Sequence, residues 1–156
     1  MAKLRSRLDE AGYGDVRTYI ASGNILLDGS KSGTAVARDL ERIVAEEFGV
    51  DTTAIVRKPT ELAALVSKHP FGRDTSRSHV VFLAARPTAA AAERLAGTDH
   101  SPDRGVLAGR EVYVQYGGGV QNAHLSPARL ERLLGVAGTH RNWRTVVALA
   151  ELAADA

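Results

Sequence analysis

The chain has 156 residues, of which 44% are hydrophobic and 24% charged, with a formal net charge of +2. Such a length and composition indicate a globular protein of one domain, or of two small domains packed together. The absence of cysteine excludes disulfides, thiolate metal sites and a cysteine nucleophile, and suits a reducing cytoplasm. The 20 basic and 18 acidic residues nearly balance, so the charge gives no strong argument for nucleic acid.

Neither a targeting segment nor a membrane span is expected. Residues 1–12 alternate charged residues with leucine and lack the apolar stretch of a signal peptide. The longest apolar run, from Val80 to Ala85, is too short to cross a bilayer. We therefore predict a cytoplasmic protein without a membrane partner.

The first half of the chain begins with a helix and two short strands. Leucine spacing predicts a helix over residues 2–11 that stops at Gly12. Residues 16–20 and 25–27 have extended character on either side of a turn at 22–24, which predicts two short strands or one sharply bent strand.

The clearest helix covers residues 34–48 and ends before Gly49. Its apolar residues share one helical face: Val36, Leu40, Ile43, Val44 and Phe48. The β-branched residues that follow predict a strand over 52–57, and Pro59 opens a further helix.

A domain boundary is expected after this helix, which His69-Pro70-Phe71-Gly72 breaks. The polar loop that follows, up to Ser78, separates two predicted domains, residues 1–72 and 73–156.

The second half begins with an apolar strand over 79–85, a run typical of a strand covered on both faces. The other predicted elements are a helix capped by Thr88, strands over 104–108 and 111–116 around Gly109-Arg110, a helix capped by Ser126, and a helix from Asn142 to about Ala153.

The two halves therefore contain nearly the same order of elements, α-β-β-α-β and β-α-β-β-α. Each is part of the β-α-β-β-α-β order of the ferredoxin-like plait. We predict an α+β protein with two plait-type units side by side and a C-terminal helix. The first unit lacks its opening strand, so we expect the native start upstream of Met1, or a partner strand in its place. The alternative is that the strand count is wrong and the sheet of this unit simply starts later.

Three stretches carry a resemblance to a known family: DVRTYIASGNILL at 15–27, HPF at 69–71 and RNWRTV at 141–146. Together with the order of elements, they resemble the bacterial family known as domain of unknown function 1697, from about Leu4 to Leu152. Members of that family begin with an apolar strand and a glycine-rich turn, which agrees with the expected truncation.

The same resemblance shows two departures. A basic residue is common in the family where this chain has Ala148, and a lysine where it has His124. A function that depends on those cations is absent here or performed differently. The family has no established activity, so the resemblance implies a fold rather than a function.

The turn at Ser22-Gly23-Asn24 is the first candidate site. A hydroxyl, a flexible backbone and a carboxamide together can hold an anion or a polar ligand. Arg17 and Thr18 precede the turn on opposite faces of their strand. The alternative is a plain turn in which glycine supplies a positive φ and asparagine bonds its own backbone.

The predicted start of the last helix is the second candidate. Its N–H groups and the flanking Arg141 would attract an anion, with Asn142 and Thr145 beside it. Alternatively, Asn142 is only an N-cap and Trp143 a core residue. If the two candidates converge in space, a phosphate or carboxylate site results.

No pattern in the sequence indicates a metal site, a cofactor or a catalytic centre. The five histidines lack the short spacings of metal ligands, and no nucleophile elbow or phosphate-binding glycine loop is present.

We therefore predict a binding or regulatory module for an anionic or polar small ligand. The alternatives are a nucleic-acid-binding plait, an enzyme completed by a missing N-terminal glycine-rich segment, and a homodimer formed through a sheet edge.

Overall fold

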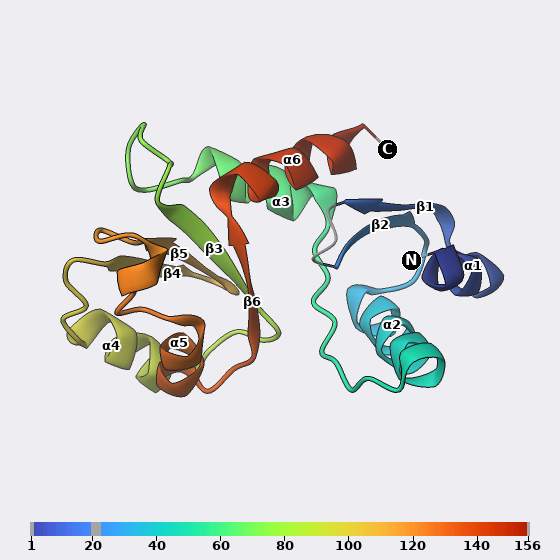
Figure 1. Ribbon diagram of the computed structural model, residues 1–156, viewed down its shortest axis with the longest axis horizontal. Helices are drawn as coiled ribbons and strands as arrows, with labels where there is room; N and C mark the ends of the chain where they lie inside the picture. Colours follow the sequence, from blue (N-terminus) through green and yellow to red (C-terminus); the bar gives the residue numbers. More distant parts are fainter. Residues whose placement is uncertain (1, 20–22, 156) are drawn as a thin grey trace. The chain divides into compact units, whose positions relative to one another are not determined.

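The computed structural model describes residues 2–19 and 23–155 and has a mixed α+β architecture (Figure 1). The chain divides into two compact units. The first contains Met1–Ala63 and Leu149–Ala156, and the second contains Ala64–Ala148. No helix in the described part of the chain is long and apolar enough to span a membrane.

The first unit contains two helices and a two-stranded antiparallel sheet. These elements are α1 (Ala2–Glu10), β1 (Gly14–Tyr19), β2 (Asn24–Asp28) and α2 (Gly33–Phe48). All four were predicted, and Gly49 ends α2 in the left-handed conformation, with φ of 65°.

The core of the first unit lies between its helices and its sheet. The buried members of this cluster are Leu4, Leu8, Tyr13, Val36 and Ile43. The predicted strand over 52–57 is wrong, because residues 51–58 form neither helix nor strand. Val56 packs against the core without pairing, so its β-branched character reflects burial rather than a sheet position.

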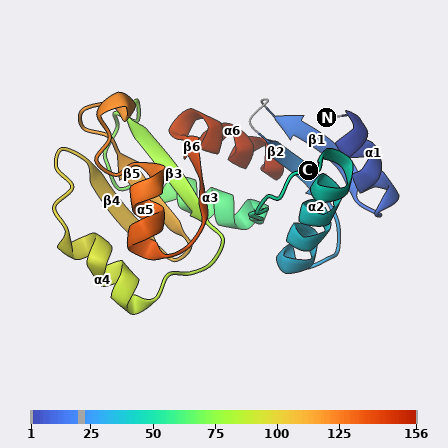
Figure 2. The same ribbon diagram turned by 60° about the horizontal axis from the view of Figure 1, so that its bottom comes forward.

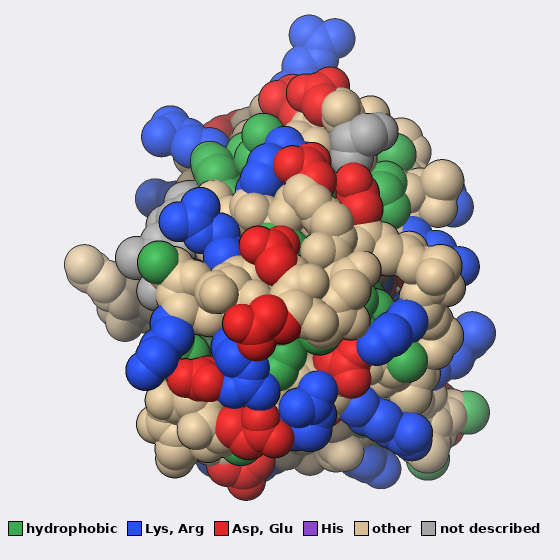
Figure 3. Space-filling view, turned by 90° about the vertical axis from the view of Figure 1, so that its right-hand side faces the viewer, with side chains coloured by type: hydrophobic (Ala, Val, Ile, Leu, Met, Phe, Trp, Pro, Cys, Tyr) green, Lys and Arg blue, Asp and Glu red, His purple; other side chains and the backbone are tan. Residues whose placement is uncertain are grey.

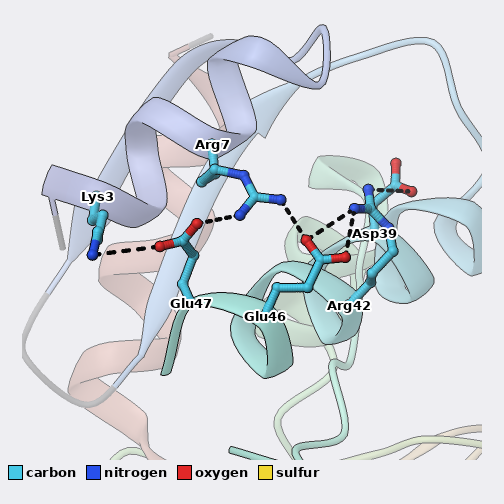
Figure 4. Close-up of polar contacts among 6 residues, drawn as sticks. All are labelled: Lys3, Arg7, Asp39, Arg42, Glu46 and Glu47. Carbon is cyan, nitrogen blue, oxygen red and sulfur yellow. Dashed lines mark hydrogen bonds and ion pairs between the residues drawn. The ribbon is translucent and has the colours of Figure 1, made fainter. Parts of the chain in front are cut away.

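Ion pairs connect α1 to α2 on the surface of the first unit (Figure 4). Arg7 of α1 bonds both Glu46 and Glu47 of α2, and Lys3 lies 3.6 Å from Glu47. Figure 3 shows basic and acidic side chains interspersed on the face that this view presents. The pairs fix the two helices to each other, but solvent and salt screen them.

The second unit contains a four-stranded antiparallel sheet. Its elements in chain order are β3 (Ser78–Leu83), α4 (Ala89–Gly97), β4 (Arg104–Ala108), β5 (Glu111–Gln115), a 3₁₀ turn (Val120–Asn122), α5 (Pro127–Leu134) and β6 (Gly138–Asn142). The strands lie in the order β4-β5-β3-β6, and all three pairs are antiparallel. Two further helices, α3 (Pro59–Ser67) and α6 (Trp143–Ala154), belong partly to each unit.

Strand β6 was missed by the sequence prediction, which starts a helix at Asn142. The segment Gly138–Asn142 is polar and lies at the edge of the sheet, where its pairing with β3 defines it. Such edge strands carry little of the apolar alternation that identifies a strand.

Helices α4 and α5 cover one face of this sheet (Figure 2). Val81, Val112 and Val114 project from that face into a cluster with Leu95 and Leu130. The opposite face is also buried, and the Tyr113 hydroxyl there donates a hydrogen bond to the Leu65 carbonyl at 2.7 Å. Both faces of β3 are therefore covered, as its continuous apolar run predicts.

The turns and caps of the second unit form as predicted. Thr88 and Ser126 accept hydrogen bonds from the first turns of α4 and α5. Gly109 has a φ of 64° in the β4–β5 hairpin, where a glycine avoids strain.

Asp103 organises the loops at one end of the sheet. Its side chain is 5% exposed and accepts hydrogen bonds from the backbone N–H groups of Gly117, His124 and Leu125, at 3.1, 2.6 and 3.0 Å. A Cβ atom at Gly117 would lie 2.2 Å from the Pro102 carbonyl oxygen. Glycine is therefore required at residue 117 for close packing.

Candidate functional site

The junction between β6 and α6 places Asn142 at the end of the sheet. Asn142 is the last residue of β6 and pairs with His79 of β3. Its side-chain oxygen accepts a hydrogen bond from the Thr145 N–H at 2.9 Å, so it is the N-cap of α6. The N–H groups of Trp143 and Arg144, in the same first turn, have no acceptor within the helix.

A cleft of about 570 Å³ lies at this junction, within the second unit. Its walls come from the loop before β3 and from the start of α6, two segments about seventy residues apart in the sequence. The residues that line it are Arg73, Asp74, Thr75, Ser76, Ser78, Asn142, Trp143 and Arg144.

The polar groups of the cleft favour an anion. Arg73 and Arg144 each bring a permanent positive charge, and Thr75 and Ser76 bring hydroxyl groups. Asp74 is the one carboxylate among the lining residues, and hydrogen bonds from Ser76 lower its pKa. The two arginines outnumber it, so the net charge of the cleft is positive.

Trp143 packs against the partly buried His69, which is hydrogen-bonded to the buried Ser78. The rings of His69 and Trp143 lie 4.4 Å apart, at 48° to each other. His69 Nε2 lies 3.0 Å from Ser78 Oγ, and Phe71 meets the His69 ring edge-on at 5.6 Å. Burial lowers the pKa of His69, so the ring next to the indole is neutral at neutral pH.

Arg141 and Thr145, which the sequence places in the same candidate site, are not among the described residues that line the cleft. Arg141 donates to the Thr139 hydroxyl and to the His140 carbonyl, both at 2.7 Å, and burial lowers its pKa. Thr145 is buried in the first turn of α6.

The other predicted group lies in the first unit, around the β1–β2 hairpin. Arg17 is half-buried and lies 3.3 Å from Asp15, whereas Thr18 is exposed, as their opposite faces require. Asn24 donates to the Tyr19 carbonyl at 3.1 Å, and Gly23 has a φ of 87°. These contacts agree with a structural turn.

Ser22 lies outside the described residues. Because the hairpin and the cleft belong to different units, their convergence stays a prediction.

The sequence prediction named one wall of this cleft and missed the other. Asn142 was predicted, but Arg73, Thr75 and Ser76 were assigned to a domain boundary. The only signal for them is a cluster of arginine and hydroxyl residues after Phe71, a composition that ordinary surface loops share.

The described residues contain no group of three or more histidine, aspartate or glutamate side chains arranged to hold a metal ion. A ligand for this cleft would therefore be held by the arginines, the hydroxyls and the backbone of the lining residues.

Comparisons with known proteins find a family but no described activity. A model described as "Protein of unknown function (DUF1697)" matches residues 1–113. A conserved bacterial protein from Streptococcus pneumoniae, SP0830, has a similar fold, with a TM-score of 0.75 and 18% identity over 98% of this chain and 88% of that one. No curated protein matches.

Proposed function

The chain belongs to the DUF1697 family, as its sequence motifs indicated, and we propose that it is a binding module for a small anionic ligand. The observation that carries the proposal is the cleft of the second unit, where Arg73 and Arg144 lie on two walls with the hydroxyls of Thr75 and Ser76.

The charges and donors of the cleft match the chemistry of a phosphate or carboxylate. A guanidinium group presents a planar set of N–H donors that can bond two oxygen atoms of such an anion. The start of α6 adds backbone N–H groups and the positive end of a helix of 12 residues. The cleft is open to solvent on one side, and its volume of about 570 Å³ leaves room for a small molecule.

Calorimetric titration of the full chain with inorganic phosphate and small carboxylates at low ionic strength tests this proposal. Arg144→Gln is expected to weaken binding roughly 10- to 100-fold, because a hydrogen bond to a charged group contributes about 1.5–3 kcal/mol. The matched control is Arg132→Gln, an exposed arginine of α5 that does not line the cleft. Absence of binding across the panel, or an equal loss in both variants, would contradict the proposal.

Nucleic-acid binding is the second candidate and receives less support. Plait domains that bind single strands stack bases on aromatic side chains of the sheet. Here Phe82, Tyr113 and Tyr116 are buried in the second unit, where no base can reach them.

We also propose that the domains predicted over residues 1–72 and 73–156 are both plait-type. The order of the elements supports a plait in each unit. The second unit has the order β3-α4-β4-β5-α5-β6, and the first has the order α1-β1-β2-α2. A cytoplasmic location and a homodimer through a sheet edge remain proposals. The first is supported by the absence of cysteine and the second by the edge position of β4.

A further inference from the structure

We propose that the ligand of the cleft carries an aromatic ring that stacks on Trp143 next to its anionic group, which makes a nucleoside monophosphate the fitting class. This inference rests on the proposed function, and it adds the recognition of a second chemical group by a different side chain.

The first observation is the position of Trp143. It is partly exposed and lines the same cleft as Arg73 and Arg144. A tryptophan that only filled the core would have no part in the wall of a charged cleft. Its indole face can stack on a planar ring of any base, whereas the arginines bond only the anionic group.

The second observation is the rigid support behind the indole. His69 packs against Trp143 at 4.4 Å, and Ser78 holds the His69 ring by a hydrogen bond of 3.0 Å. Phe71 and Tyr113 contact the same imidazole edge-on, at 5.6 and 6.3 Å. The indole is therefore fixed before the ligand arrives, which lowers the entropic cost of binding.

Ser78 and His69 also have the spacing of a serine nucleophile and its base, but burial argues for a different role. Ser78 lines the cleft but is only 2% exposed, so a substrate has little access to its hydroxyl. We assign the pair to positioning Trp143 rather than to catalysis.

The indole of Trp143 lies next to the cationic groups of the cleft, and this arrangement defines the class of ligand. Trp143 and Arg144 are consecutive in the first turn of α6, and Arg73 contributes from the loop before β3. A ligand that satisfies both needs an aromatic ring and an anion joined by a short linker. The base, ribose and phosphate of a nucleoside monophosphate supply these groups.

The single tryptophan of the chain makes this proposal directly measurable, because all indole fluorescence comes from Trp143. The full chain is titrated with adenosine monophosphate, ribose 5-phosphate, adenosine and inorganic phosphate. We expect saturable quenching by adenosine monophosphate and an affinity roughly 5- to 150-fold above that of ribose 5-phosphate, the range that one stacked base contributes.

Variants separate stacking from folding. Trp143→Leu, followed by calorimetry, is expected to bind adenosine monophosphate no better than ribose 5-phosphate, while Trp143→Phe retains most of the preference. Circular dichroism verifies that each variant is folded. If Trp143→Leu does not fold, the comparison of the two ligands on the unmodified chain decides the question.

Two outcomes overturn the inference in distinguishable ways. Equal affinity for adenosine monophosphate and ribose 5-phosphate removes the stacking proposal but leaves the anion site intact. Failure of all four compounds to bind removes both proposals.

Discussion

The two units of this chain reach stability by different means. The first has a two-stranded sheet, one small cluster, and helices joined by ion pairs at the surface. The second has a four-stranded sheet covered on both faces, with buried hydrogen bonds that Tyr113 and Tyr116 donate and that Asp103 accepts. Since a two-stranded sheet contributes little alone, the second unit provides the more rigid frame. The cleft lies on that frame.

A precise binding site needs the larger, covered sheet of the second unit as its support. Binding groups must be held within a fraction of an ångström, and regular elements do this better than isolated loops. Asn142 and Trp143 are fixed by the pairing of β6 with β3 and by the cap of α6. Substitutions that test the frame should therefore differ strongly between the two units.

The largest effect is expected for Asp103→Ala in the second unit. The change leaves the N–H groups of Gly117, His124 and Leu125 without their buried acceptor. We expect a loss of about 3 kcal/mol or more in the free energy of unfolding, measured by urea denaturation. The control is Asp99→Ala, an exposed aspartate whose bonds are confined to Ser101, with an expected loss below about 1 kcal/mol. Equal losses would show that Asp103 does not organise the frame.

Acid should weaken the second unit through His140. Burial, with the nearby charges of His79 and Arg141, lowers the pKa of His140 from its ordinary 6.5 to about 4. Between these values the unfolded chain binds the extra proton and the folded one does not. Stability is therefore full above about pH 6.5 and falls as the pH drops towards 4.

We expect this histidine to contribute about 2 kcal/mol of the acid loss, allowing for its partial exposure. His140→Gln keeps a polar partner for the Tyr116 hydroxyl but cannot titrate. The measurement is the urea unfolding free energy of both proteins at about pH 7 and about pH 4.5. If the unmodified chain and His140→Gln lose the same free energy of unfolding between the two pH values, the protonation of His140 does not cause the acid loss.

The smallest effect is expected for Arg7→Gln in the first unit. Arg7 bonds Glu46 and Glu47, and these bonds raise its pKa and lower those of both carboxyls. Because Glu46 is exposed and Arg7 and Glu47 are only partly buried at the surface, we expect a small fall in the thermal midpoint that shrinks in about 1 M salt. Arg5→Gln, on the same helix, is the control. A large fall that salt does not reduce would show that the first unit depends on this contact as strongly as the second depends on Asp103.

Local patterns predicted most helices and strands because their signals lie within a few residues. Helix α2 follows from five apolar residues on one face and from Gly49 at its end. The β4–β5 hairpin follows from Gly109 between two alternating runs. Strand β6 has no such signal, since it forms only by pairing with β3, about sixty residues earlier.

The same difference between local signals and contacts of distant segments explains why only part of the candidate site was predicted. Asn142 could be named because a helix start has a local signature. Arg73, Thr75 and Ser76 could not, because their role depends on the contact between the loop before β3 and the start of α6. The hairpin group around Arg17 and Asn24 also has a local pattern, and its part in a site stays a prediction because Ser22 lies outside the described residues.

Amide chemical shifts of the full chain, recorded during a titration with inorganic phosphate, test whether the cleft of the second unit binds an anion. We expect the largest changes at the N–H groups of Trp143, Arg144, Thr75 and Ser76, in the second unit. Changes confined to residues 17–24 of the first unit, or no saturable change in the folded protein, would contradict it.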